Sequence, residues 1–276
     1  MPAGTSLSDT PSEGELEMDL GITGRVAIVT GASRGLGRQA ALSLAGEGVS
    51  LVVCARGVER LEETALELRA AGAEVVAVEA DATVTADLER LFAAAVAAFG
   101  QVDIVVNNVG GRSGNGGLEA TSDAELERAF DLNVIGALRL IRLAIPGMRE
   151  RRWGRVVNIA SIFGREHGGP TIGYMTAKAA LIAATKHLAL ELARDGILVN
   201  SVAPGSILFP GGSWDRFVMT QTPEAVEAFI QTNLPMGRFG WPEPVGDLVA
   251  YLSSERAGLI AGACINIDGG QSHSLF

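Results

Sequence analysis

The segment from Arg25 to Gly37 reads RVAIVTGASRGLG, and it predicts most of the fold. Its first six residues include a short β-branched apolar run, which is typical of a buried strand. Glycines follow in the spacing G-x-x-x-G-x-G, at Gly31, Gly35 and Gly37, just before a stretch of helical period. Glycines at a strand-to-helix turn let a pyrophosphate approach the backbone and the helix N-terminus. The spacing differs from the general G-x-G-x-x-G fingerprint, but its place between a strand and a helix favours a dinucleotide site over a turn without a ligand.

The alternation of short apolar runs and longer helical stretches continues through the chain. Six more strand-like runs follow: SLVVCA (50–55), EVVAVE (74–79), DIVVNN (103–108), RVVNIAS (155–161), ILVNSVAP (197–204) and ACINID (263–268). Between them, helical stretches begin at residues 35, 58 and 83 and cover 123–151, 174–194 and about 244–253. We therefore expect an α/β protein with a single Rossmann-type, doubly wound domain, in which helices cover both faces of a seven-stranded parallel sheet.

Composition supports one large core and argues against polyanionic partners. The chain has 276 residues, of which 47% are hydrophobic and 20% charged, enough for one buried core. Its 22 basic and 32 acidic residues give a net charge of −10, which disfavours nucleic acid and anionic membrane surfaces as partners. No apolar run approaches the roughly 20 residues of a membrane helix, and we expect a cytoplasmic protein.

Two smaller features complete this outline. Residues 1–20 carry five acidic and no basic side chains, so we expect them to form a disordered acidic extension, with 21–276 as the dinucleotide-binding catalytic domain. Cys54 and Cys264 each lie in a strand-like run, and we expect buried free thiols. No clustering of residues suggests a metal site.

The end of the second strand indicates which dinucleotide is bound. NAD-binding proteins of this architecture normally carry an acidic residue there, which bonds the ribose hydroxyls. This chain has Ala55 followed by Arg56, and Arg34 in the glycine-rich loop can reach the same region. Guanidinium groups suit the fork geometry of a 2′-phosphate. We expect NADP(H), with NAD(H) as the alternative; a solvated strand-end charge is the simplest other reading of Arg56.

Two further loop positions are placed to serve the same site. Asp81 follows the third strand and could bond the adenine amino group. Asn107 and Asn108 end the fourth strand and could brace the adjoining loops. Each of these could equally be a plain turn residue.

The strongest chemical signal is the pair Tyr174 and Lys178. Their i, i+4 spacing puts both side chains on one face of a helix. An adjacent ammonium stabilises a phenolate, so we expect Lys178 to lower the pKa of Tyr174 into the range of general acid–base catalysis. Tyr174 is then the proton donor or acceptor.

Ser161 and Asn133 complete the candidate catalytic group. Ser161 follows the fifth strand, at the carboxyl end where open α/β sheets bind ligands, and its hydroxyl could polarise a substrate carbonyl. Asn133 could hold a water or a backbone contact behind Lys178. A serine nucleophile is the competing reading, but no G-x-S-x-G elbow surrounds Ser161 and none of the three histidines, His167, His187 and His273, is marked as its base.

Taken together, these motifs resemble those of the short-chain dehydrogenases/reductases, and in particular the group of 3-oxoacyl-thioester (acyl carrier protein) reductases. The motifs that carry the resemblance are TGASRGLG (30–37), NNVG (107–110), Asn133, Ser161, YMTAK (174–178) and Pro204-Gly205. The resemblance covers about residues 22–272. One departure is Val109, where the family usually has alanine, and only minor repacking is expected from it.

The resemblance implies the roles of these residues. It makes Asn133, Ser161, Tyr174 and Lys178 the catalytic set, with Lys178 also bonding the nicotinamide ribose and 202–207 lying against the nicotinamide. With the residues argued above, the expected cofactor contacts are Gly31, Ser33, Arg34, Gly35, Leu36, Gly37, Arg56, Asp81, Ala82, Asn108, Gly110, Tyr174, Lys178, Pro204, Gly205 and Ile207. It also implies a homotetramer or a homodimer.

We therefore expect an NADP(H)-dependent oxidoreductase that transfers a hydride between the nicotinamide and a carbonyl compound or secondary alcohol. We expect an insertion at about 206–241 to act as a lid, and its apolar residues Phe209, Trp214, Phe217, Met219 and Phe229 suggest a bulky or hydrophobic ketone, or a 3-oxoacyl thioester. Two alternatives stay open: a dehydrogenase of a cyclic, sugar-like or steroid alcohol, and a dinucleotide-binding regulator without catalysis.

Overall fold

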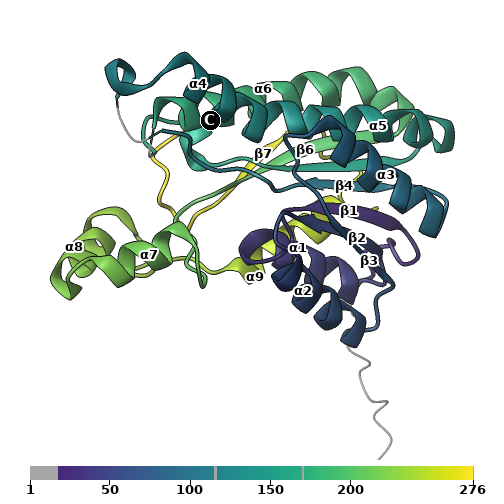
Figure 1. The fold of residues 1–276 in the computed structure, drawn as a ribbon, viewed down its shortest axis with the longest axis horizontal. Coiled ribbons are helices and arrows are strands. Elements are labelled where there is room, and N and C mark those ends of the chain that lie inside the picture. The colour runs from purple at the N-terminus through teal and green to yellow at the C-terminus, as the bar shows by residue number, and fades with distance from the viewer. Residues whose placement is uncertain (1–17, 115–116, 170, 276) are drawn as a thin grey trace, which may run out of the picture.

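The computed structural model describes residues 18–114, 117–169 and 171–275. Within them, seven strands form one sheet in the order β3-β2-β1-β4-β5-β6-β7 (Figure 1). The strands are β1 (Val26–Thr30), β2 (Ser50–Ala55), β3 (Val75–Glu79), β4 (Ile104–Asn107), β5 (Gly154–Ile159), β6 (Ile197–Pro204) and β7 (Cys264–Ile267). Every neighbouring pair is parallel. The strand order reverses between β1 and β4, and ligands of open α/β sheets bind at such a point.

Helices cover both faces of the sheet, as expected. They are α1 (Gly35–Gly46), α2 (Val58–Ala70), α3 (Thr85–Phe99), α4 (Asp123–Phe130), α5 (Gly136–Arg151), α6 (Ile172–Leu192), α7 (Ser213–Thr220), α8 (Pro223–Asn233) and α9 (Pro242–Leu252). One buried cluster joins α1, α2 and α9 to the sheet, and a second joins α3, α5 and α6 to the opposite face. In β1, Ala27 and Val29 belong to the first cluster and Ile28 to the second, because successive strand residues point to opposite faces.

The long helical stretch expected over 123–151 is confirmed. It contains a π-helical turn at Asp131–Ile135, between α4 and α5. Gly136 follows this turn, and a Cβ there would lie 2.3 Å from the carbonyl oxygen of Ala82, so the chain passes very close to the neighbouring loop. π-helical turns occur frequently at functional sites, and this one contains Asn133.

Two smaller expectations need correction. The third helix begins at Thr85 and not at Thr83, because the Asp81 carboxylate accepts hydrogen bonds from the backbone N–H and hydroxyl of Thr83 and holds that residue in a turn. Cys54 is buried, and burial raises the pKa of its thiol to about 12. Cys264 is only half buried, because β7 is an edge strand.

The N-terminal segment and the 206–241 insertion are the two remaining parts of the chain. Residues 1–17 of the expected extension lie outside the described residues. Leu20 is buried in the first cluster, and its carbonyl oxygen accepts a hydrogen bond from the backbone N–H of Glu255. Residues 206–241 contain α7 and α8, which extend away from the sheet at the carboxyl end of the strands (Figure 1).

Candidate functional site

The glycine-rich loop is built for close approach of a ligand to the backbone. Gly31 and Gly35 have φ values of +66° and +56°, which residues other than glycine rarely adopt. A Cβ on Gly37 would lie 2.4 Å from both the carbonyl oxygen of Gly31 and Nδ2 of Asn108. Arg34, which precedes α1, makes no side-chain capping bond, so the N–H groups of the first turn keep their capacity to bind an anion. This cradle fits the pyrophosphate of a dinucleotide.

Asn108 braces the loop in the way expected from the sequence. Its Nδ2 donates to the carbonyl oxygens of Thr30 and Gly31, each at 3.0 Å. Its backbone N–H donates to the Thr30 hydroxyl, also at 3.0 Å. Asn107 donates to Oδ1 of Asn158 at 2.8 Å and thereby links β4 to β5.

The residues expected to contact the adenosine end of the cofactor lie at the carboxyl ends of β1, β2 and β3. The Arg56 side chain is 78% exposed, with its guanidinium 3.9 Å from the Asp81 carboxylate. Arg34 donates to the carbonyl oxygen of Gly211 at 2.7 Å, so it lies against the turn that precedes α7. Ala82 is buried beside Asp81. The arrangement leaves two guanidinium groups near the open end of the glycine-rich loop.

Ser161, Tyr174 and Lys178 come together at the end of β5. Tyr174 and Ser161 are hydrogen-bonded through their side chains, and the Ser161 hydroxyl also accepts from the N–H of Phe163 at 3.2 Å. Thr171 caps α6 by accepting from the N–H of Tyr174 at 3.2 Å, which fixes Tyr174 in the first turn. Lys178 is buried one turn later, and its ammonium donates to the carbonyl oxygen of Ile159 at 2.7 Å.

The electrostatics of this group differ from the expectation. Burial raises the pKa of Tyr174, and its hydrogen bond with Ser161 opposes that rise only in part. Burial also lowers the pKa of Lys178 to about 8. The expectation that Lys178 lowers the pKa of Tyr174 is therefore wrong for the protein without ligands. The Lys178 ammonium is directed at a carbonyl oxygen and lies 5.9 Å from the centroid of the Tyr174 ring.

Asn133 and Gly110 lie directly beside Lys178. Asn133 bonds Gly111 twice, accepting its N–H at 3.0 Å and donating to its carbonyl oxygen at 2.8 Å. It also donates to the carbonyl oxygen of Ala129 at 2.8 Å, across the π-helical turn. A Cβ on Gly110 would lie 2.8 Å from both Asn133 Oδ1 and Lys178 Nζ. Asn133 thus makes the backbone contact near Lys178 that the sequence suggested.

The segment after β6 closes another side of the site. Gly205 donates to the carbonyl oxygen of Ile267 at 3.2 Å, and the N–H of Ser206 donates to Oε1 of Gln271 at 2.8 Å. Ile207 is bridged to Gly240 on the return strand of the 206–241 insertion. Pro204, Gly205 and Ile207 are therefore held in one fixed segment at the carboxyl edge of β6.

The aromatic residues of the insertion mostly pack against one another. The Trp214 ring centroid lies 4.7 Å from that of Phe229, 5.6 Å from that of Phe217 and 5.5 Å from that of Phe239. Met219 is 77% exposed. The apolar surface expected to face the substrate is thus largely the insertion's own core.

Phe209 is different from these aromatics. Atoms of its ring would lie 2.5–2.8 Å from a Cβ on Gly35, so the ring packs on the glycine-rich loop. No local pattern in the sequence marks this contact. The cap Thr171 was also missed, although its spacing to Tyr174 is typical of helix N-caps.

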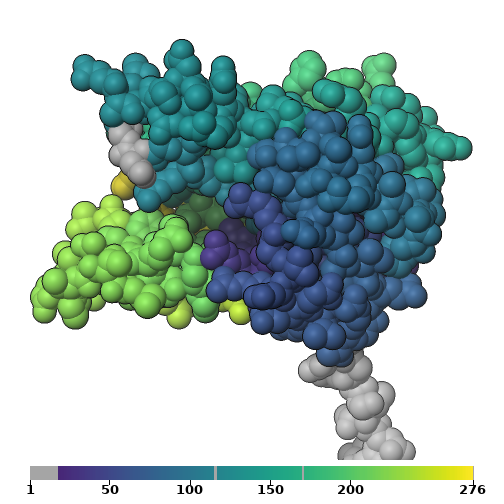
Figure 2. All heavy atoms as spheres, in the orientation of Figure 1, coloured from purple at the N-terminus to yellow at the C-terminus, as the bar shows by residue number. Residues whose placement is uncertain are grey.

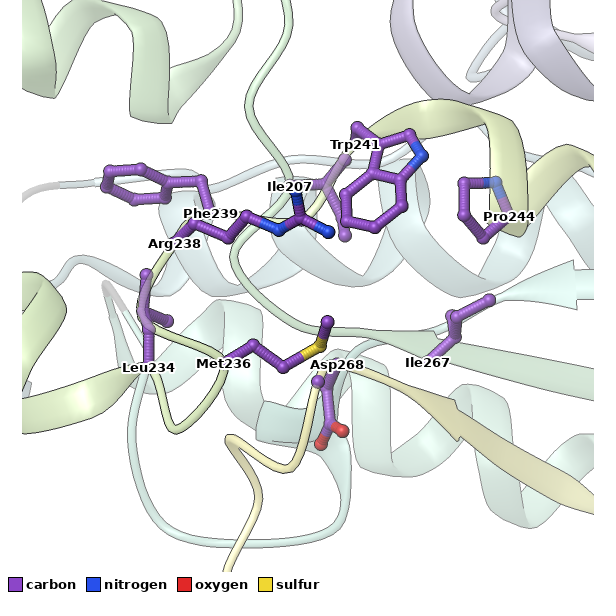
Figure 3. A pocket seen from close by; sticks show the side chains of 11 residues that line it. Ile207, Leu234, Met236, Arg238, Phe239, Trp241, Pro244, Ile267 and Asp268 are labelled. Carbon is purple, nitrogen blue, oxygen red and sulfur yellow. The ribbon is translucent and has the colours of Figure 1, made fainter.

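The surface is hollowed beside these residues. Figure 2 shows a hollow between the atoms of α4 and those of α7 and α8, with atoms of the N-terminal part of the chain at its floor. A separate apolar pocket lies behind Ile207 and is lined by Leu234, Met236, Phe239 and Trp241, with the Arg238 guanidinium 4.5 Å from the Trp241 ring centroid (Figure 3). Ser161, Tyr174 and Lys178 do not line this pocket.

The histidines do not join the catalytic group. His167 and His273 are exposed, and His187 pairs with Glu191 on α6 at 3.7 Å. Among the described residues, no cluster of three or more His, Cys, Asp or Glu side chains could hold a metal ion. The same residues contain no helix long and apolar enough to cross a membrane.

Comparison with known proteins agrees with this geometry. The model of the short chain dehydrogenase family matches residues 25–216. A 3-oxoacyl-acyl-carrier-protein reductase of Staphylococcus aureus is 33% identical over 249 residues, which are 88% of this chain and 96% of that protein.

Two solved structures are similar over almost their whole length. L-sorbose reductase from Gluconobacter frateurii, in complex with NADPH and L-sorbose, matches with a TM-score of 0.85 and 33% identity, covering 94% of this chain and 100% of that one. A variant of actinorhodin polyketide ketoreductase with NADPH matches with a TM-score of 0.84 and 36% identity, covering 90% and 97%. The chain therefore belongs to the short-chain dehydrogenase family.

Proposed function

We propose that the protein is an NADP(H)-dependent oxidoreductase that reduces a carbonyl group to a secondary alcohol. The observation that carries this proposal is the hydrogen-bonded pair of Ser161 and Tyr174 with the buried Lys178, at the carboxyl end of β5 and next to the glycine-rich loop. The family of the chain and the NADPH-bound reductases similar to it support the same conclusion.

The chain's own residues handle the proton. A nicotinamide held by the glycine-rich loop and the segment after β6 would supply the hydride for the carbonyl carbon. The Ser161 and Tyr174 hydroxyls hydrogen-bond the carbonyl oxygen, and Tyr174 donates its proton to that oxygen as negative charge develops there. Burial raises the pKa of Tyr174, so the phenol carries its proton in the protein without ligands and is present as the donor. Lys178 supplies positive charge beside the phenol, and Asn133 fixes the Gly110–Gly111 backbone next to it.

The cofactor contacts proposed for this chain follow from the loop geometry. The N–H groups of Gly35, Leu36 and Gly37 bind the pyrophosphate, with Gly31 and Ser33 shaping the turn. Arg34 and Arg56 bind the 2′-phosphate, and Asp81 and Ala82 border the adenine. The segment from Pro204 to Ile207 would lie against the nicotinamide. Asn108 and Gly110 would contact the cofactor from the other side. The exposed Arg56 is available to bind a phosphate. Position 55 is alanine, so the chain lacks the acidic residue that would favour NAD(H) there.

The substrate is a hydrophobic or bulky ketone or a 3-oxoacyl thioester, held under the 206–241 lid. Similarity to a 3-oxoacyl reductase supports the thioester, and similarity to a sugar reductase supports a free ketone. Operation in reverse, as an alcohol dehydrogenase, uses the same residues.

The protein also presents surfaces that suit contact with a second copy of the chain. The edge strand β7 and exposed apolar side chains such as Leu259 suit contact with another subunit, in a homotetramer or homodimer acting in the cytoplasm.

The direct test follows the absorbance of NADPH with acetoacetyl-CoA and with a panel of cyclic, sugar-like and steroid ketones. Turnover of any one supports the reductase and identifies its substrate class. NADPH binding without turnover of any ketone, or of the matching alcohols with NADP⁺, would support a regulator instead.

A further inference from the structure

The segment after β7, residues 268–274, is bonded to two different parts of the site; we name it the C-terminal tail. Oε2 of Glu166 accepts three hydrogen bonds from it: from the Ser272 hydroxyl at 2.9 Å and from the backbone N–H groups of His273 and Ser274, each at 2.8 Å. A carboxylate that accepts several N–H and O–H donors makes strong, charge-assisted hydrogen bonds. Glu166 is therefore the anchor of the tail.

Glu166 belongs to the turn that carries Ser161. From Ser161 the chain enters a single 3₁₀ turn, Ile162–Gly164, and the N–H of Glu166 donates to the carbonyl oxygen of Ile162 at 3.2 Å. The adjacent Arg165 donates to the carbonyl oxygen of Cys264 at 2.8 Å and to Oδ1 of Asn266 at 2.7 Å, which ties the same turn to β7. Glu166 is thus connected to Ser161 through one hydrogen-bonded turn.

The other end of the tail holds the segment that follows β6. Oε1 of Gln271 accepts the N–H of Ser206 at 2.8 Å. The space beside Gly205 is filled by Asp268 and Gln271, since a Cβ there would lie 2.7 Å from Cβ of Asp268 and from Oε1 of Gln271. Asp268 itself shapes the tail by accepting the N–H groups of Gly270 and Ser272 at 3.0 and 2.9 Å.

These contacts make the tail a bridge between the two segments that flank the reacting groups. The tail follows β7, the neighbour of β6, and so begins at the carboxyl edge of the sheet, where the site lies. A carbonyl carbon must lie within reach of both the Ser161–Tyr174 pair and the nicotinamide, and small displacements of such groups cost large factors in rate. We propose that the C-terminal tail is a wall of the substrate site, with Glu166 and Gln271 as positioning residues that fix the Ser161 turn relative to the Pro204–Ile207 segment.

This inference rests on the proposed reductase function, and its test combines substrate kinetics with a measurement that needs no substrate. In Glu166→Ala, backbone amides of the tail should exchange hydrogen faster, and kcat/KM for the ketone should fall about tenfold, because the Ser161 turn is no longer held against the Pro204–Ile207 segment. NADPH affinity should be unchanged, because the Glu166 carboxylate accepts its hydrogen bonds from the tail and not from the glycine-rich loop. Glu166→Gln keeps one acceptor oxygen, so its amide exchange and its activity with the ketone should lie between those of Glu166→Ala and the wild type. Glu191→Ala, which removes an exposed carboxylate on α6, is the control and should alter neither.

Gln271→Ala tests the second contact separately. It removes the acceptor of the Ser206 N–H, so we expect weaker NADPH binding or a lower kcat with little change in the KM for the ketone. Faster exchange of the tail in Glu166→Ala with an unchanged kcat/KM for the ketone would show that Glu166 has only a structural role and would overturn the proposed wall. Unchanged exchange would overturn the anchor itself. If the wild type binds NADPH but reduces no ketone, the proposed function and the wall fail together, whereas the exchange result still decides the anchor.

Discussion

The ammonium of Lys178 donates a hydrogen bond to the carbonyl oxygen of Ile159 over 2.7 Å. Ile159 is the last residue of β5, two positions before Ser161, and Lys178 lies one turn after Tyr174 on α6. The bond therefore joins the strand that carries the serine to the helix that carries the tyrosine. Because Lys178 is buried, this single contact both places its charge and limits how the two elements can move apart.

Burial of Lys178 predicts a specific pH dependence of stability. Its pKa falls from 10.5 to about 8 on folding, so between these values the unfolded chain binds the proton more tightly. The free energy of unfolding contributed by this group should rise as pH increases from about 8 to 10.5, by an amount on the order of 3 kcal/mol.

The measurement compares wild type with Lys178→Met by denaturant unfolding at several pH values. Cys54 also makes stability depend on pH, because burial raises the pKa of its thiol. Both proteins contain Cys54, so its contribution cancels in the difference between their free energies of unfolding. We expect the stability of the wild type relative to the variant to be lowest below pH 8 and to increase toward pH 10. A difference that is flat over this range would contradict a desolvated ammonium.

Gly37 and Gly46 stand at opposite ends of α1 and offer a matched pair of substitutions. A Cβ on Gly37 meets the Gly31 carbonyl oxygen and Asn108 at 2.4 Å, whereas a Cβ on Gly46 meets nothing within 4 Å. Gly37→Ala should abolish dinucleotide binding and lower the unfolding temperature. Gly46→Ala should leave binding unchanged and stabilise the protein by up to about 1 kcal/mol. Calorimetry with and without NADPH measures both, and equal effects of the two would refute the close approach at Gly37.

Arg56 is expected to discriminate between the two dinucleotides. Arg56→Ala should weaken NADPH by about tenfold to a hundredfold, the value of one charge-assisted contact, and leave NADH nearly unaffected. Titration of each reduced cofactor by fluorescence gives both constants. Arg69→Ala removes a guanidinium in the last turn of α2 and serves as the control. The assignment fails if Arg56→Ala weakens NADPH and NADH equally.

The sequence predicts this fold well because the relevant signals are local. Each buried parallel strand is a short apolar run, and the glycine-rich loop and the Tyr174–Lys178 pair lie within single elements, where spacing alone determines the shared face. The bracing of the glycine-rich loop by Asn108 could also be expected, since β1 and β4 are neighbours at the point where the strand order reverses.

What the sequence did not predict depends on contacts between distant segments. The π-helical turn at Asn133 reflects the passage of Gly136 against Ala82, and the Phe209 ring reaches Gly35 from the far part of the chain. The pKa of Tyr174 is raised because the whole fold buries its phenol. The i, i+4 spacing to Lys178 could suggest only the opposite shift, because it carries no information on burial.

The central claim is that Tyr174 transfers the proton, and Tyr174→Phe tests it most directly. The variant keeps the ring but loses the hydroxyl that meets Ser161, so NADPH binding should be retained while the rate of NADPH oxidation with the best ketone found for the wild type falls by about a thousandfold or more. The two proteins should be compared in the same absorbance assay, with NADPH affinity measured beside it. Retained binding with lost turnover is the result we predict; turnover by Tyr174→Phe at the wild-type rate would contradict the account.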